Sequence, residues 1–285
     1  MRKLVPWWTR IGAKLLLSRL PTRYALWRSL NIFAHGAMRE TNYALGVFQR
    51  HFAHSGLARG QRFAALELGP GDSLSSAVIA AAYGAARTYL VDAGEFATSK
   101  VSIYRETANR LLEMGLKAPD LADAQDVKDV LSACGASYGV RGLKSLAEIP
   151  SESVDFIWSH AVLEHVRRRD FKDFIRETRR ILRPSGVCSH QIDLQDHLGG
   201  ALNNMRIPSR WWEADWMARS GFYTNRLRKS EMMCAFSSAG FAAKVISVSH
   251  WENLPTPRRK LAREFDGLES NDLLVKEFHV LLTAT

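Results

Sequence analysis

Short apolar runs alternate with stretches of helical periodicity along the middle of the chain. Runs of strand length occupy residues 63–69, 88–92, 154–158 and 187–194, and a further strand is expected near residues 140–144. Helical periodicity occupies residues 74–83, 100–114, 121–134 and 171–182. Parallel strands that are covered on both sides are apolar throughout and are joined by crossover helices. The alternation therefore predicts an α/β fold, in which helices cover both faces of a parallel sheet.

The C-terminal part departs from this alternation. A helix is expected over residues 230–239, and strands are expected over residues 243–249 and 274–283. We expect residues 59–285 to form the main domain, with an insertion at about residues 198–229. Residues 1–58 are expected to form a basic helical extension or lid.

Positive charge is concentrated at the N-terminus. The 285 residues include 39 Lys and Arg against 29 Asp and Glu, which gives a formal net charge of +10. Eight of the bases precede the first acid, Glu40, so residues 1–40 carry +7 and the rest of the chain carries +3. Binding to nucleic acid is favoured by a basic face on the folded body. Here most of the excess charge lies in an N-terminal leader and not on the body, so nucleic acid is not an expected partner.

The leader, residues 1–33, mixes these bases with apolar side chains, among them Trp7 and Trp8. Arg10 and Lys14 interrupt its apolar run and no small-residue cleavage site follows, so the leader does not have the pattern of a signal peptide. Three interpretations stay open. The leader is a basic amphipathic helix on a membrane surface, a helix docked on the main domain, or a lid over an active site.

The spacing of the cysteines and the length of the longest apolar stretch indicate the cellular compartment of the protein. Cys134, Cys188 and Cys234 are widely spaced and form no CxxC pair, which excludes a disulfide scaffold and a cysteine-rich zinc module. The longest purely apolar stretch, residues 77–86, is shorter than the roughly 18 residues that a membrane-spanning helix needs. We expect a cytoplasmic protein, with peripheral membrane contact through the leader as an alternative.

A glycine turn follows the first predicted strand. The segment Glu67–Ser73 joins this strand to a helix, and Gly69 and Gly71 let the backbone pass close to a ligand. Asp92 ends the next strand, 21 residues beyond Gly71, which suits a carboxylate that accepts hydrogen bonds from both ribose hydroxyls of a nucleoside. Leu74 stands where the dinucleotide fingerprint has its third glycine. The turn therefore predicts a nucleoside site of another kind.

With these motifs the chain resembles a class I S-adenosylmethionine-dependent methyltransferase of the small-molecule type. Glu67–Ser73 resembles the first motif of that family, and Asp92 matches its ribose-binding acid. Ser151–Val166 resembles its fourth strand and the helix after it, and Arg180–Val187 resembles the turn before its fifth strand. The resemblance covers residues 60–285. It implies a Rossmann-like, seven-stranded, mostly parallel sheet with an antiparallel last strand, and S-adenosyl-L-methionine as the cofactor.

The resemblance also implies which residues contact the cofactor. They are Glu67, Gly69, Gly71, Ser73, Asp92, Ser145, Leu146, Ser159 and His160. The family often has an acid beside the adenine after its third strand, whereas segment 144–150 contains only Glu148, so Ser145 and Leu146 are expected beside the adenine instead. His160 lies at the mouth of the fourth strand and is expected to face the methionine part of the cofactor.

Transfer of a methyl group to a hydroxyl needs alignment of the reacting atoms and a base, most often a histidine. The segment His190–His197 runs off the fifth predicted strand, and strand alternation puts His190 and Asp193 on opposite faces. We predict that His190 or His197 is the base and that Asp193 orients it, with His165 as the next candidate. A hydrogen-bonded loop and a divalent metal are alternative interpretations of this segment. Its spacing matches no metal signature, so no metal ligand is predicted.

Acceptor recognition is expected from the insertion, residues 198–229. It is rich in Trp, Tyr, Asn and Arg, which provide flat apolar contact, hydroxyl recognition and phosphate or carboxylate binding. A sugar, or a sugar on a phosphate carrier, would suit this mixture, and a buried helical insertion is the alternative. Arg167–Arg169 and four arginines between Arg176 and Arg183 form a basic run, which is expected to be a solvated face, with phosphate contact as the alternative.

Together these features predict an enzyme that transfers a methyl group from S-adenosyl-L-methionine to a small-molecule acceptor. The expected target is a hydroxyl of a sugar, a glycan precursor or a secondary metabolite. A lipid or quinone methyltransferase at a membrane surface, a nucleic-acid methyltransferase and a cofactor-binding module without turnover are the alternatives. The sequence assigns no oligomeric state.

Overall fold

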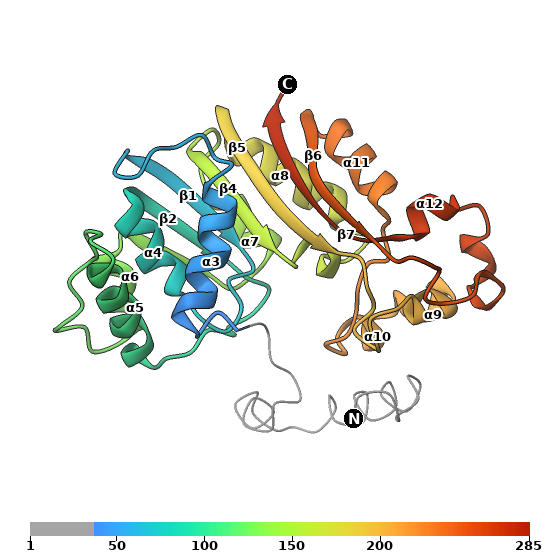
Figure 1. The fold of residues 1–285 in the computed structure, drawn as a ribbon, viewed down its shortest axis with the longest axis horizontal. Helices are drawn as coiled ribbons and strands as arrows, with labels where there is room; N and C mark the ends of the chain where they lie inside the picture. The colour runs from blue at the N-terminus through green and yellow to red at the C-terminus, as the bar shows by residue number, and fades with distance from the viewer. Residues whose placement is uncertain (1–36) are drawn as a thin grey trace.

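The computed structural model describes residues 37–285, and the sheet at its centre has seven strands (Figure 1). The strands are β1 (Phe63–Leu68), β2 (Ala85–Val91), β3 (Ala136–Gly139), β4 (Val154–His160), β5 (Leu182–Asp193), β6 (Phe241–His250) and β7 (Val275–Ala284). Their order across the sheet is β3-β2-β1-β4-β5-β7-β6. Strand β7 is antiparallel to both of its neighbours, and the pairs among β1 to β5 are parallel. The predicted Rossmann-like, mostly parallel seven-stranded sheet is confirmed.

One predicted strand is wrong. The third strand was expected near residues 140–144, but β3 lies at Ala136–Gly139, and residues 143–147 form the next helix. The sequence of β3, Ala-Ser-Tyr-Gly, contains no apolar run because the strand lies at the edge of the sheet and all four residues are only half buried. A search for apolar runs therefore passes over it.

The helices agree with their predicted positions more closely. They are α3 (Thr41–Phe52), α4 (Ser75–Tyr83), α5 (Val101–Glu113), α6 (Val127–Ala133), α7 (Leu143–Ala147), α8 (Phe171–Ile181), α9 (Ser209–Trp212), α10 (Asp215–Ala218), α11 (Lys229–Ser238) and α12 (Ser270–Leu273), with short 3-10 turns η1 (Leu163–His165), η2 (Asn203–Arg206), η3 (Arg258–Lys260) and η4 (Arg263–Phe265). Helix α6 begins six residues later than residue 121, because Asp126 caps it. The carboxylate of Asp126 accepts hydrogen bonds from the backbone N–H groups of Lys128 and Asp129, at 2.8 and 3.0 Å.

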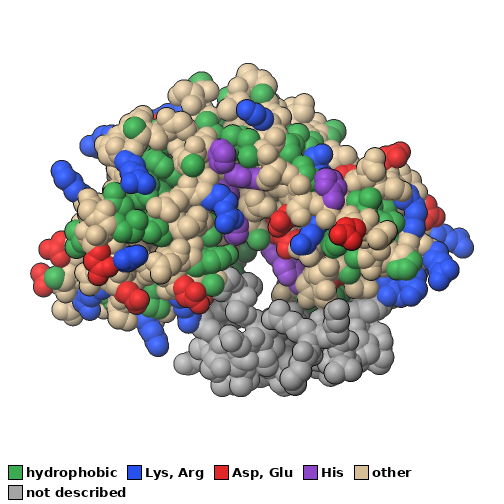
Figure 2. All heavy atoms as spheres, viewed as in Figure 1, with side chains coloured by type: hydrophobic (Ala, Val, Ile, Leu, Met, Phe, Trp, Pro, Cys, Tyr) green, Lys and Arg blue, Asp and Glu red, His purple; other side chains and the backbone are tan. Residues whose placement is uncertain are grey.

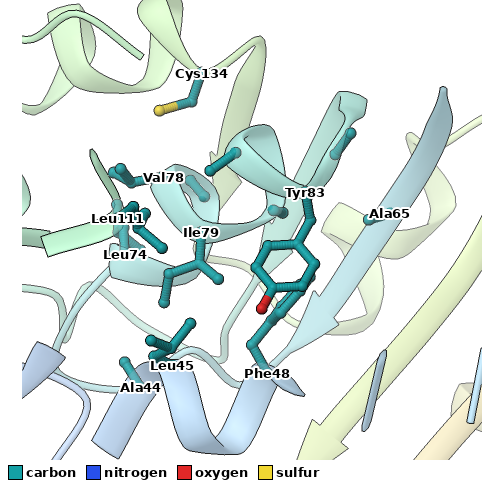
Figure 3. Close-up of a cluster of buried hydrophobic side chains, with 14 of the residues drawn as sticks. Ala44, Leu45, Phe48, Ala65, Leu74, Val78, Ile79, Tyr83, Leu111 and Cys134 are labelled. Carbon is teal, nitrogen blue, oxygen red and sulfur yellow. The ribbon is translucent and has the colours of Figure 1, made fainter. Parts of the chain in front are cut away.

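Two hydrophobic cores hold helices against opposite faces of the sheet. The first joins α3, α4, α5 and α6 to one face, and Figure 3 shows Leu45 and Phe48 of α3 meeting Ile79 and Tyr83 of α4. The rings of Phe48 and Tyr83 are 5.0 Å apart. The second core joins α7, α8 and α11 to the other face. Figure 1 shows α3 in front of the sheet and α8 and α11 behind β5, β7 and β6.

The leader and most of the predicted extension lie outside the described residues. The described part of the extension contains α3, which packs on α4 and α5 within the first core. Arg39 precedes α3, and its Nε lies 3.3 Å from a carboxylate oxygen of Asp72 in the glycine turn. Within residues 37–285 the structure contains no helix that is long and apolar enough to span a membrane.

Candidate active site

The glycine turn leaves β1 at the carboxyl end of the sheet. Gly69 and Gly71 have φ angles of 68° and 71°, a region that L side chains rarely adopt. A Cβ atom on Gly69 would lie 2.5 Å from a methyl group of Val162, which follows β4. Only glycine therefore fits at position 69, and the turn is packed against the end of β4.

Asp92 lies at the end of β2, beside the turn. Its carboxylate accepts hydrogen bonds from the backbone N–H of Gly71, at 3.0 Å, and of Ala93, at 2.7 Å. Burial raises its pKa to about 6, against the lowering effect of these two bonds. Carboxylate oxygens accept more than one hydrogen bond, so Asp92 retains acceptor capacity for ribose hydroxyls. The turn and this acid fit the nucleoside part of S-adenosyl-L-methionine.

Glu67 and Ser73 flank the two glycines of the turn. The Glu67 carboxylate is buried and accepts hydrogen bonds from the Ser76 hydroxyl and from Nε1 of Trp158, the latter at 3.1 Å. Burial raises the pKa of Glu67 to about 7. Ser73 is fully buried, and its Oγ accepts a hydrogen bond from the Ser75 backbone N–H. Both side chains hold the turn and the start of α4 in place.

The segment after β3 reaches Asp92 through its backbone. The Gly139 carbonyl accepts a hydrogen bond from the Asp92 N–H at 2.9 Å, and the Gly142 N–H donates to the Asp92 carbonyl at 2.8 Å. Ser145 and Leu146 follow in α7 and are buried. The sequence analysis did not single out Gly139 or Gly142; the φ angle of 52° at Gly142 explains why glycine occupies that position.

Ser159 and His190 form a buried pair on neighbouring strands. Ser159 Oγ lies 2.8 Å from His190 Nδ1, and both side chains are fully buried on the side of the second core. Burial lowers the pKa of His190 to about 3, with a smaller effect from His279. The structure thus places His190 inside the domain and away from the rim of the crevice, where a base was expected.

The opposite side of the same strand ends lines a pocket of about 390 Å³. Its wall consists of Arg50, His160, Ala161, Gln191, Asp193, Ser247, Glu277 and His279. These residues come from α3 and from β4, β5, β6 and β7, so the pocket lies where four strands and one helix meet. Figure 2 shows His, basic and acidic side chains gathered around the hollow in the middle of this face. His160 and Ala161 directly precede Val162, which packs on Gly69, so the pocket adjoins the glycine turn.

Two histidines of the pocket are held uncharged. Burial lowers the pKa of His160, with a smaller effect from Arg50, and burial lowers the pKa of His279 to about 4. His279 Nε2 shares a hydrogen bond of 2.8 Å with the Ser189 hydroxyl, which also lies 2.8 Å from Nδ1 of His51. His160 Nδ1 is buried and has no hydrogen-bond partner among residues 37–285.

The backbone at the end of β4 is strained. Ala161 has a φ angle of 55°, a conformation that costs free energy in a residue other than glycine. Its N–H donates a hydrogen bond to the Gln191 carbonyl at 2.9 Å. This bond fixes the direction in which the chain leaves His160. Strain of this kind gathers at functional sites, which agrees with the position of Ala161 between the turn and the pocket.

His165 and His197 form a second histidine group at the strand ends. Their rings stack with centroids 4.8 Å apart, and His165 Nδ1 lies 2.8 Å from the Tyr223 carbonyl. Both residues are exposed. Asp193 is separate from this stack and lies in the pocket, where its carboxylate accepts a hydrogen bond from the Gln195 N–H at 2.9 Å.

Two arginines of the insertion, Arg226 and Arg228, make internal contacts that stabilise its fold. Arg226 donates to the Ile207 carbonyl and the Ser209 hydroxyl, both at 2.7 Å, and its guanidinium lies over the Trp212 ring. Arg228 is buried and donates to several backbone carbonyls, among them Leu194. These arginines therefore hold the insertion on the main domain.

The basic run is paired internally. Arg167 donates to the Asp215 carboxylate at 2.5 Å, and Arg168 donates to the Glu231 carboxylate at 2.6 Å. Further along, Arg176, Arg180 and Arg183 form ion pairs with Asp173, Glu177 and Asp155. This segment therefore presents few unpaired cations to a phosphate backbone.

Within residues 37–285, no three His, Cys, Asp or Glu side chains are grouped as a metal site requires. Five ionisable residues line the pocket, and three of them, Arg50, Glu277 and His279, were not among the residues predicted from the sequence. Glu277 and His279 lie opposite Asp193 and Gln191 in the antiparallel register of β5 and β7. That register brings residues about 80 positions apart side by side, and local pattern carries no signal for it.

Comparison with known proteins finds one matching family and several similar solved structures. Residues 121–189 match the protein family that is described as "Methyltransferase domain". No curated protein matches the chain. The chain is similar to the structure of an S-adenosylmethionine-dependent methyltransferase from Mesorhizobium loti, at 18% identity over 84% of this chain and 95% of that one, with a TM-score of 0.43. It is also similar to an S-adenosylmethionine-dependent methyltransferase from Methanosarcina mazei, at 15% identity over 83% of this chain and 95% of that one, with a TM-score of 0.46. A third such structure, from Archaeoglobus fulgidus, is 9% identical over 85% of this chain and 94% of that one, with a TM-score of 0.45.

The sheet order, with its antiparallel β7, agrees with the family match, and the turn and Asp92 agree with the cofactor. The chain is a class I, Rossmann-fold S-adenosylmethionine-dependent methyltransferase.

Proposed function

We propose that this methyltransferase modifies a hydroxyl of a small polar acceptor, such as a sugar, a glycan precursor or a secondary metabolite. The observation that supports this most strongly is the pocket beside the glycine turn. Its volume of about 390 Å³ suits a small molecule, and its wall is almost entirely polar. Oxygen-rich acceptors would find hydrogen-bond partners on every side of it.

When bound, the cofactor would supply an electrophilic methyl group to the acceptor oxygen. Gly69, Gly71 and Asp92 would hold the nucleoside part. His160 stands between the turn and the pocket, at the point where the acceptor oxygen would approach. The pocket would orient the acceptor oxygen toward the methyl group, and alignment of this kind supplies much of the rate in such a displacement.

His160 is our preferred base within this proposal. Its lowered pKa keeps the ring unprotonated at neutral pH, and its buried Nδ1 has an unused lone pair or proton. The stacked pair His165 and His197 is the second candidate, and Asp193 is retained as an orienting carboxylate from the pocket wall. His190 is the least suited, because its side chain is fully buried.

A lipid or quinone acceptor at a membrane surface is the second candidate function. Two tryptophans of the insertion favour it, since the side chains of Trp211 and Trp216 are 52% and 42% exposed. Exposed tryptophans prefer the interface between lipid and water. The free cysteines and the apolar pattern agree with the proposed cytoplasmic location in either case.

One experiment separates these acceptor classes. The purified protein is incubated with methyl-labelled S-adenosylmethionine and a whole-cell extract, which is then divided into RNA, protein, lipid and small-molecule fractions. We expect the label in the small-molecule fraction with the parent protein and little label with Asp92→Ala. Label in the lipid fraction would support the second candidate, and label in RNA would contradict both.

A further inference from the structure

We propose that the acceptor carries an ammonium group and an anionic group, and that the pocket reads both. Glu277 and Asp193 would bind the ammonium, and Arg50 would bind the anion. The proposal rests on the proposed function, because it takes the pocket as the acceptor site. It narrows the polar acceptor to a small zwitterion, such as a phosphorylated amino sugar.

Two carboxylates form a pair at the pocket wall. Asp193 of β5 and Glu277 of β7 are directly opposite each other in the sheet register, and both line the pocket. Like charges that face each other across two strands destabilise a sheet. Among residues 37–285 no cation forms an ion pair with either carboxylate. An ammonium group between them would remove this repulsion.

Arg50 supplies the positive charge of the pocket wall. This residue is exposed, lines the same pocket and forms no ion pair within the described part of the chain. Its charge nevertheless lies close enough to His160 and His279 to contribute to their lowered pKa values, after the larger effect of burial. Six of the seven arginines of the basic run, by contrast, form ion pairs with acids. Arg50 is therefore a cation at a concave surface with its binding capacity unused.

The charges of the side chains that line the pocket are mixed in sign. With His160 and His279 uncharged at neutral pH, the pocket wall carries one positive and two negative side chains. A neutral sugar would leave all three without a counter-charge, and a simple anion would satisfy only Arg50. A zwitterion satisfies both sides, while Gln191 and Ser247 remain to bind hydroxyls.

Four sugars test this charge pattern, by calorimetry on the full chain saturated with S-adenosylhomocysteine at neutral pH. Glucosamine 6-phosphate carries both groups, glucosamine only the amine, glucose 6-phosphate only the anion, and glucose neither. We expect the first to bind most tightly and glucose most weakly. Arg50→Gln should weaken only the two phosphates and Glu277→Gln only the two amines, each by about ten- to a hundredfold.

Matched variants guard against indirect effects. Arg62→Gln, at an exposed position before β1, and Glu269→Gln, at an exposed position before α12, should leave all four affinities unchanged. Arg50→Lys should restore part of the phosphate affinity, because it restores the charge. Unchanged thermal unfolding and S-adenosylhomocysteine affinity would show that Arg50→Gln and Glu277→Gln are folded.

The proposal is overturned if the four sugars bind equally, if none binds, or if both variants weaken all four to the same degree. Failure of the proposed function has a different signature. In that case the expected charge pattern is seen in the titrations, but the labelled methyl group is absent from the small-molecule fraction. A labelled small-molecule product that lacks an amine would overturn the zwitterion while leaving the function in place.

Discussion

The carboxylate of Asp92 accepts a hydrogen bond from the backbone N–H of Gly71 at 3.0 Å. One contact thus ties the end of β2 to the glycine turn that leaves β1. Asp92, which we propose as the ribose-binding acid, therefore also fixes the loop that passes beside it. The two motifs of the proposed cofactor site are therefore one structural unit.

Substitution of Gly69 should disturb both the fold and the site. The added Cβ of Gly69→Ala would lie 2.5 Å from Val162, in a backbone conformation with φ of 68°. We expect a loss of about 1–3 kcal/mol in the free energy of unfolding, measured by denaturant titration. Adding Val162→Ala should recover part of this loss, because it removes the clash.

The matched control for this substitution is Gly46→Ala. Gly46 lies in the middle of α3, and a Cβ there meets nothing within 4 Å. This variant should gain about 1 kcal/mol, since alanine favours the helix more than glycine does. Equal effects of the two glycine substitutions would contradict the steric account of the turn.

The buried Glu67 should make stability depend on pH. Burial raises its pKa from 4.5 to about 7, so the folded state holds the proton more tightly than the unfolded chain does. Stability from this group is therefore fully present below pH 4.5 and is lost as the pH rises through 7, by about 3 kcal/mol.

Glu67→Gln isolates this effect, because an amide can keep the contacts with Ser76 and Trp158 but cannot ionise in this range. Unfolding of the two proteins is measured from pH 5 to pH 8. We expect the variant to gain stability relative to the parent as the pH rises. A stability difference that stays constant across this interval would rule out the titration of Glu67.

The identity of the base is tested by single-turnover rates. His160→Gln should slow methyl transfer to the small-molecule fraction by about 10²–10⁴-fold, with unchanged affinity for S-adenosylhomocysteine. Because burial lowers the pKa of His160, the parent rate should stay level on acidification to below pH 6.5, the ordinary pKa of histidine. If His165→Gln or His197→Gln lowers the rate and His160→Gln does not, the stacked pair is the base instead.

The fold was predictable from local pattern to the extent that its strands are apolar. Strands β1, β4, β5 and β7 have apolar cores and were located from sequence, whereas the antiparallel direction of β7 was implied by the family resemblance. Strand β3 was missed because an edge strand with half-buried residues has no apolar run. Helix α6 was drawn too long, since periodicity did not reveal the capping role of Asp126.

Some residues of the candidate site could likewise be predicted from local sequence, and others depend on contacts between distant parts of the chain. Gly69, Gly71 and Asp92 lie at strand ends that a local motif identifies. The pocket could not be foreseen, because it depends on α3 lying beside β5 and on the register between β5 and β7. Strand alternation correctly separated His190 from Asp193, but it could not tell which of the two faces was buried.

The assignment of the cofactor site is tested most directly by a calorimetric titration of S-adenosylhomocysteine into the parent protein, Asp92→Asn and Asp123→Asn. Asp92→Asn keeps an acceptor for the Gly71 N–H but loses the charge that strengthens hydrogen bonds from ribose hydroxyls. We predict an affinity about ten- to a hundredfold weaker for this variant. Asp123 is exposed between α5 and α6, and its variant should bind like the parent. Equal affinities for all three proteins would contradict the assignment of the cofactor site to the ends of β1 and β2.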